Sequence, residues 1–81
     1  MSTNNMLTVE YNDKDECVEL HFNKNGAMYM INILNQCIRL SHNEHYNLFT
    51  PSWGGNELSE EKQNTDDASK LINHLKIMFW D

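Results

Sequence analysis

The sequence predicts a single α+β domain, in which a four-stranded, mainly antiparallel sheet is covered by one helix. Two patterns support this class. Apolar and polar residues alternate in several short stretches, and in one longer stretch apolar residues recur every three or four positions. The 81 residues are enough for one domain and too few for two. Hydrophobic residues make up 40% of the chain, as in a folded domain. We therefore treat residues 1–81 as one small domain.

The first two strands form a predicted hairpin. Leu7–Tyr11 alternates apolar and polar residues, which is the pattern of a half-buried strand. Asn12–Glu16 is polar and rich in turn-forming residues, and Cys17–Phe22 alternates again. The apolar residues of this second stretch share one face: Val18, Leu20 and Phe22. The spacing predicts two antiparallel strands joined by a tight connection.

The period then changes to that of a helix over Ala27–Leu40. Asn25 is the expected N-cap, and the Ser41–Asn43 segment is the expected stop. Arg39 near the C-terminus complements the helix dipole. The predicted core stripe consists of Ala27, Met30, Ile31, Leu34, Cys37 and Ile38.

Two further strands complete the predicted order ββαββ. Glu44–Thr50 alternates and ends at Pro51, because proline cannot donate to a ladder. Leu71–Trp80 is apolar on both faces toward its end, so we expect a strand that is covered on both sides. The segment between these strands, residues 51–70, is the least regular part of the chain.

Charge and hydropathy limit the classes of partner. Twelve acidic against six basic residues give a formal net charge of −6, which disfavours direct binding to nucleic acid or to an anionic membrane. It favours a cationic partner, or serves solubility alone. The longest apolar run, Ala27–Ile31, is far shorter than a membrane span, and Met1–Asn5 does not resemble a signal peptide. We expect a cytoplasmic location.

Few side chains suggest catalysis. Three histidines on predicted strands, His21, His45 and His74, fall outside the best core positions and could share the open sheet face with Glu10 and Glu19. A metal site can be drawn there, but polar side chains on a solvated face explain the pattern more simply. Cys17 and Cys37 are expected to be free thiols. We expect no catalytic residues, no metal and no cofactor.

The long irregular segment carries the strongest functional signal. It contains the string Thr50-Pro-Ser-Trp-Gly-Gly-Asn-Glu-Leu58, and loops of this length in a small domain are usually functional or disordered. Two interpretations of Trp53 arise. Trp53 either packs over the open sheet face and fixes the loop, or it is a partly exposed anchor for a partner, beside an acidic rim of Glu57, Glu60 and Glu61.

With His45-Tyr-Asn-Leu-Phe49 before it and Asn73-His-Leu-Lys-Ile77 after it, this segment resembles the immunity protein 32 family of bacterial polymorphic toxin systems. The resemblance extends from about His45 to the C-terminus. It implies a protein that binds a cognate toxin, expected to be basic, and protects the producing cell. By this resemblance the characteristic positions are His45, Pro51, Trp53, Gly54, Gly55 and His74.

These arguments give a set of candidate residues and one alternative function. The glycines and Pro51 are expected to shape the loop, and a structural role is favoured for Trp53 as well. The candidate partner-binding residues are Trp53, Glu57, Glu60, Glu61, His45 and His74, and the candidate loop-shaping residues are Pro51, Gly54 and Gly55. The alternative is a non-catalytic interaction module, homodimeric through an apolar open sheet face composed of Phe49, Ile72, Met78 and Trp80.

Overall fold

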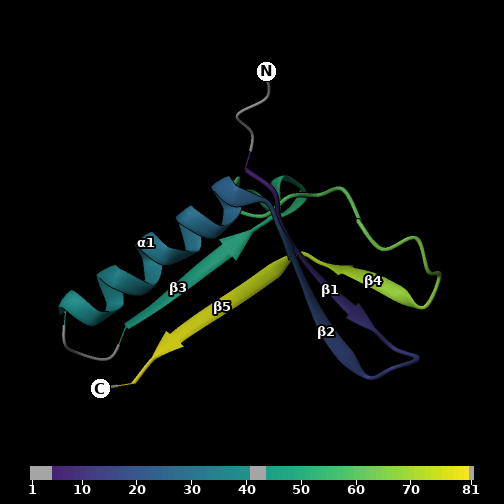
Figure 1. The fold of residues 1–81 in the computed structure, drawn as a ribbon, viewed down its shortest axis with the longest axis horizontal. Coiled ribbons are helices and arrows are strands. Elements are labelled where there is room, and N and C mark those ends of the chain that lie inside the picture. The colour runs from purple at the N-terminus through teal and green to yellow at the C-terminus, as the bar shows by residue number, and fades with distance from the viewer. Residues whose placement is uncertain (1–4, 41–43, 81) are drawn as a thin grey trace.

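The computed structural model describes residues 5–40 and 44–80 and contains five strands and one helix in the order ββα, β, then ββ after a long loop. The strands are β1 (Leu7–Asn12), β2 (Cys17–Phe22), β3 (Glu44–Phe49), β4 (Ser69–Ile72) and β5 (His74–Phe79), and the helix is α1 (Lys24–Leu40). They form an arch with one sheet in each limb (Figure 1). The α+β class and the single helix are confirmed.

The single four-stranded sheet is wrong. The described residues form a three-stranded sheet in the order β2-β1-β4 and a two-stranded sheet, β3-β5, and all pairs are antiparallel. The predicted final strand, Leu71–Trp80, is divided at Asn73 into β4 and β5. Thr50 holds this division, because its backbone N–H donates to Asn73 O at 3.1 Å and its hydroxyl donates to Asn73 Oδ1 at 2.7 Å.

The helix begins three residues earlier than predicted. The cap is Asn23, not Asn25, because the Asn23 Oδ1 accepts from the Gly26 N–H at 2.8 Å and from the Met6 N–H at 3.0 Å. Gly26 is required here, since an added Cβ would lie 2.0 Å from the Met6 carbonyl oxygen. The predicted stop, Ser41–Asn43, lies outside the described residues.

The core lies between the helix and the two sheets. It is built from five buried side chains, with Tyr29, Met30, Tyr46, Ile72, Leu75 and Ile77 packed around them. The five are Leu7, Val9, Ile33, Leu48 and Leu58. The helix buries Ile33 and Cys37, whereas Ile31, Leu34 and Ile38 of the predicted stripe are exposed. The stripe is therefore rotated by about one position from the prediction.

Strand β1 is buried on both faces, because the core packs on one face and the 60–68 loop crosses the other. Thr8 and Glu10 are fully buried on one face, and on the opposite face Leu7 is fully buried and Val9 is 4% exposed. The Thr8 hydroxyl has no hydrogen-bond partner among the described residues, and an unpaired buried hydroxyl is destabilising.

We expect Thr8→Val to raise the free energy of unfolding by about 1 kcal/mol, because it removes the unpaired hydroxyl and keeps the shape of the side chain. Thr50→Val is the matched control, since Thr50 is equally buried but its hydroxyl donates to Asn73. It should lower the free energy of unfolding by a similar amount. Urea unfolding of both variants measures the difference, and a loss of stability in Thr8→Val would show that this hydroxyl has a partner in solution.

Candidate partner-binding site

The segment after β3 folds into a hydrogen-bonded loop around a short 3₁₀ helix, η1 (Pro51–Trp53). The Thr50 carbonyl oxygen accepts from the N–H groups of Trp53 at 2.9 Å and Gly55 at 3.1 Å. The Gly54 N–H donates to Pro51 O at 3.0 Å. Pro51 supplies the fixed φ of the first helical position, and Gly54 has φ 91°, which favours glycine. Both residues therefore fit the backbone conformation that the loop has at their positions.

Glu57 links the C-terminal part of this loop to the end of β3. Its Oε1 accepts from the backbone N–H groups of Phe49 at 3.1 Å and Asn56 at 3.3 Å, and the next residue, Leu58, donates to Phe49 O. The Phe49 N–H is the main cause of a lowered pKa for Glu57, which burial partly opposes. An added Cβ at Gly55 would lie 2.6 Å from both the Glu57 carboxylate and the Phe49 Cβ, so a side chain there would displace this arrangement.

We expect Glu57→Gln to lower the free energy of unfolding at pH 7 by about 1 kcal/mol, because one charge-assisted hydrogen-bond acceptor is weakened at a partly exposed site. A carboxylate with a lowered pKa stabilises the fold above its ordinary value of 4.5 and loses that effect as the pH falls through the lowered pKa. The difference between wild type and variant should therefore shrink below pH 4.5 in urea unfolding. Glu60→Gln replaces an exposed glutamate of the same segment, and it should change neither the free energy of unfolding at pH 7 nor its pH dependence. A pH-independent difference would contradict this role.

Trp53 does not fix the loop by burial. Its side chain is 59% exposed, so the expectation that it packs over the open sheet face is wrong. The loop is held instead by the backbone hydrogen bonds of Thr50 and by Glu57. Glu60 and Glu61 are exposed further along the same segment. The structure thus presents Trp53 to solvent from a backbone that is already fixed.

The two described histidines of the β3-β5 sheet lie at opposite ends of its outer face. His74 stacks on Phe49 with ring centroids 4.3 Å apart, and its Nε2 lies 2.9 Å from Asn47 Oδ1. His45 is exposed and stands opposite Met78. The two histidines are four strand positions apart, roughly 13 Å. His21 belongs to the other sheet, so the three histidines do not converge on one metal site.

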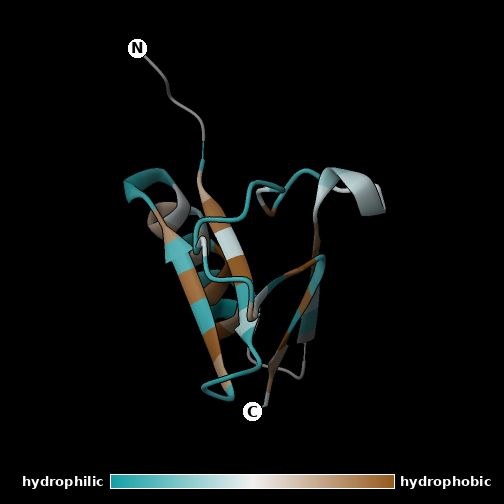
Figure 2. Ribbon diagram, turned by 90° about the vertical axis from the view of Figure 1, so that its right-hand side faces the viewer, coloured by the Kyte–Doolittle hydropathy of each residue, from teal (hydrophilic) through white to brown (hydrophobic). Residues whose placement is uncertain are grey.

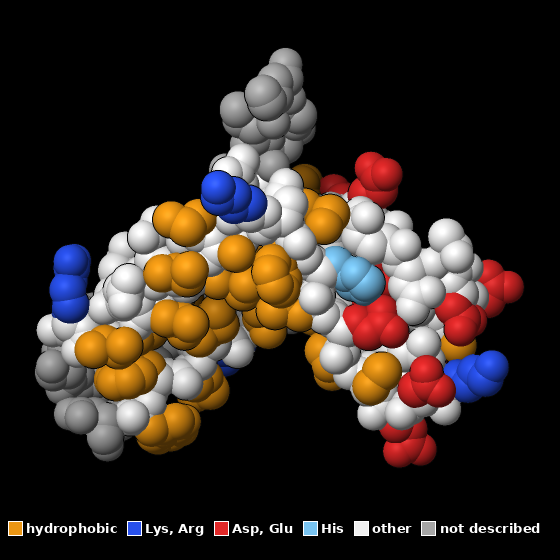
Figure 3. All heavy atoms as spheres, viewed as in Figure 1, with side chains coloured by type: hydrophobic (Ala, Val, Ile, Leu, Met, Phe, Trp, Pro, Cys, Tyr) orange, Lys and Arg blue, Asp and Glu red, His pale blue; other side chains and the backbone are white. Residues whose placement is uncertain are grey.

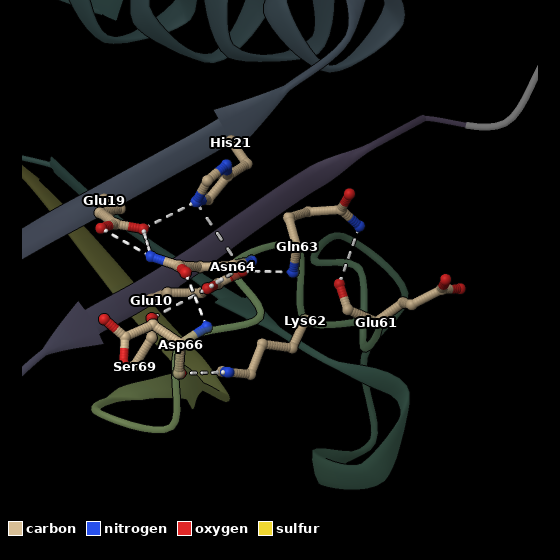
Figure 4. Close-up of polar contacts among 9 residues, drawn as sticks. All are labelled: Glu10, Glu19, His21, Glu61, Lys62, Gln63, Asn64, Asp66 and Ser69. Atoms are coloured by element: carbon tan, nitrogen blue, oxygen red, sulfur yellow. Dashed lines mark hydrogen bonds and ion pairs between the residues drawn. The ribbon is translucent and has the colours of Figure 1, made fainter.

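A different cluster joins β1 and β2 to the 60–68 loop (Figure 4). Glu10 and Glu19 stand opposite each other, and the His21 Nε2 lies 3.0 Å from Glu19 Oε1 and 3.9 Å from Glu10 Oε2. The ligand atoms of these three residues all lie within 4.8 Å of one another, which is close enough for a cation. Asn64 also reaches this group from the loop, and its Nδ2 donates to both Glu19 oxygens at 3.0 Å.

The buried Glu10 carboxylate accepts three hydrogen bonds from residues more than fifty positions later. The backbone N–H groups of Gln63 and Asn64 donate at 2.7 and 3.2 Å, and the Ser69 hydroxyl donates at 3.1 Å. The Asn64 amide is also the main cause of the lowered pKa of Glu19, followed by His21. The cluster therefore attaches the loop to β1 and β2. Sequence reasoning grouped Glu10, Glu19 and His21 on one face but gave no sign of Asn64.

Many large apolar side chains are exposed outside the loop. Figure 3 shows hydrophobic side chains gathered over α1 and on toward the place where β2 leads into it. The exposed large apolar residues of these two elements are Val18, Leu20, Phe22, Met28, Ile31, Leu34 and Ile38. Sequence reasoning assigned most of them to the core. The alternative apolar face of Phe49, Ile72, Met78 and Trp80 is not continuous, because Ile72 packs on the core and Phe49 lies against His74.

The described residues enclose no pocket, and α1 is too short and too polar to cross a membrane. Cys17 is partly buried and Cys37 buried, and both are free thiols. No family model, curated protein or solved structure matches this chain.

Proposed function

We propose that this protein is an immunity protein that acts in the cytoplasm by binding a cognate toxin and blocking it, with the 50–58 loop as the main contact. One observation carries the proposal: a loop fixed by its own hydrogen bonds presents Trp53 with 59% of its side chain exposed. The resemblance of this segment to the immunity protein 32 family supplies the class of partner.

An exposed tryptophan on a fixed loop is well suited to binding. Tryptophan is among the residues most enriched in binding hot spots, since it buries a large apolar area for few rotatable bonds. The loop is ordered before the partner arrives, because Thr50, Gly54 and Glu57 already satisfy its backbone groups. Little conformational entropy is then lost on association, and this favours affinity.

The charge of the chain favours a basic partner. In addition to Glu60 and Glu61, acidic side chains meet at the tip of the β2-β1-β4 sheet, where the Asp13 N–H donates to Ala68 O. The acidic residues of the two turns at this tip are Asp13, Asp15, Glu16, Asp66 and Asp67. With a formal charge of −6, the protein attracts a cationic toxin over several ångströms and speeds its association.

The test is co-expression with the product of the neighbouring gene, which this proposal expects to be the toxin. We expect the protein to relieve growth arrest by the toxin and to be recovered with it as a stable complex, and we expect association to slow as salt is raised. A catalytically inactive toxin variant serves as bait for affinity measurements. If the protein neither relieves the arrest nor forms a complex, the second candidate remains, which is a self-associating interaction module. The exposed apolar residues of β2 favour that candidate.

A further inference from the structure

Strand β2 is an outer strand whose side chains are apolar on the exposed face. It pairs with β1 on one side, and in the described part of the chain no strand pairs with its other edge (Figure 2). Val18, Leu20 and Phe22 are 69%, 44% and 49% exposed. An unpaired edge with exposed apolar side chains is a template for another strand.

We propose that two copies of this chain join edge to edge through β2, antiparallel, with the two-fold axis at Leu20. The two three-stranded sheets then form one six-stranded sheet. This proposal goes beyond toxin binding, since it concerns self-association and uses none of the residues of the 50–58 loop.

Cross-strand pairing selects this register. With the axis at Leu20, Val18 of each copy faces Phe22 of the other, and the two Leu20 side chains face each other. On the opposite face, Glu19 of each copy stands beside His21 of the other, so a carboxylate meets an imidazole twice. Apolar pairs directly across strands are favourable, and an imidazole beside a carboxylate can share a hydrogen bond with it.

The neighbouring registers are worse. An axis at Glu19 places the two Glu19 carboxylates directly opposite each other, and like charges there are destabilising. An axis at His21 places the two imidazoles opposite each other and leaves Val18 without an apolar partner. A register shifted by one residue pairs Glu19 with Leu20 and mixes the two faces.

The same register also matches the flanking charges. In this register the acidic β1–β2 turn of one copy, with Asp15 and Glu16, lies beside the C-terminal end of β2 in the other copy. There α1 begins with Lys24, and the helix start carries a partial positive charge. The acidic turn of one copy therefore lies near a positive end of the other, although both chains carry net negative charge.

The test combines mass measurement with cysteine cross-linking. Light scattering over a concentration series should show the mass rise from the chain's 9.6 kDa toward twice that value. For cross-linking, Cys17→Ser removes the partly buried native thiol, Cys37 is kept because it is buried, and one cysteine is added at 18, 20 or 22, where the residues are exposed. Circular dichroism and urea unfolding confirm that each variant retains the fold.

The expected cross-links are specific to the register. Leu20→Cys should form a covalent dimer under mild oxidation, because facing residues have Cα atoms about 4.5–5.5 Å apart. Val18→Cys and Phe22→Cys should not cross-link alone, since the same residue in the other chain lies four strand positions, roughly 13 Å, away. An equimolar mixture of these two should cross-link. A constant mass of one chain, or equal cross-linking of all three single variants, would overturn the proposal, and so would a dimer that Leu20→Cys does not trap.

Discussion

Replacing Glu10 by glutamine is expected to lower the free energy of unfolding by about 2–3 kcal/mol, which corresponds to roughly 10–20 °C in Tm for a domain of this size. The carboxylate is fully buried and accepts from Gln63, Asn64 and Ser69 on its two oxygens. A glutamine has one acceptor oxygen and one NH₂ group. At least one donor of the protein then faces another donor in a buried position, where an unpaired group cannot be compensated by water.

The loss should be concentrated in the loop that Glu10 holds. Hydrogen exchange of the Gln63 and Asn64 amides should speed up more than exchange in the β3-β5 sheet, because these amides donate directly to the replaced group. Glu61→Gln is the control, since Glu61 is an exposed glutamate within the same loop, and it should leave the free energy of unfolding within about 0.5 kcal/mol of wild type. A Glu10→Gln variant as stable as this control would show that the carboxylate does not hold the loop.

Replacing Trp53 by alanine is expected to weaken toxin binding by about 2 kcal/mol or more, a factor of roughly 30, while the protein remains as stable as wild type. The effect on binding follows from losing a large aromatic anchor on a preorganised loop. The small effect on stability follows from the exposure of the side chain, because the hydrogen bonds that fix the loop belong to the backbone of Thr50–Gly55 and to Glu57.

The chain provides its own control for this prediction. Trp80 is 71% exposed and follows β5, at the end of the β3-β5 sheet opposite to η1. Trp80→Ala removes the same side chain at a different place and should change the affinity by less than about twofold. Calorimetry with inactivated toxin measures both variants. If Trp80→Ala weakens binding and Trp53→Ala does not, the contact lies on the outer face of β5 and the loop assignment is wrong.

Local patterns predicted the elements well and their assembly less well. The alternation in Leu7–Tyr11 and Cys17–Phe22 correctly gave two antiparallel strands, and the three- and four-residue spacing gave the helix. The division at Asn73 shows in the alternation of Leu71–Trp80 only as one polar residue in an apolar set, because it depends on hydrogen bonds from Thr50, 23 residues away. An asparagine within an apolar strand was the available signal.

Burial was the hardest property to predict, since it depends on what covers each face. Glu10 looks like the solvent-facing member of an alternating strand, but the 60–68 loop crosses it and the carboxylate is fully buried. Val18 and Leu20 look like core residues, yet nothing in the described chain covers that part of β2. Trp53 was expected to hold its loop because tryptophan usually packs, whereas backbone hydrogen bonds and Glu57 hold it.

The place of β1 in its sheet has a consequence for biosynthesis. The groups that satisfy Glu10 follow it by 53 to 59 residues, and β4 supplies the second edge of β1 from the same distant part of the chain. At translation rates of about 5–20 residues per second, the Glu10 face and the second edge of β1 lack their partners for roughly three to twelve seconds after β1 is made. During that interval the nascent hairpin exposes the Glu10 face and an unsatisfied strand edge, and unpaired strand edges favour chaperone binding and aggregation.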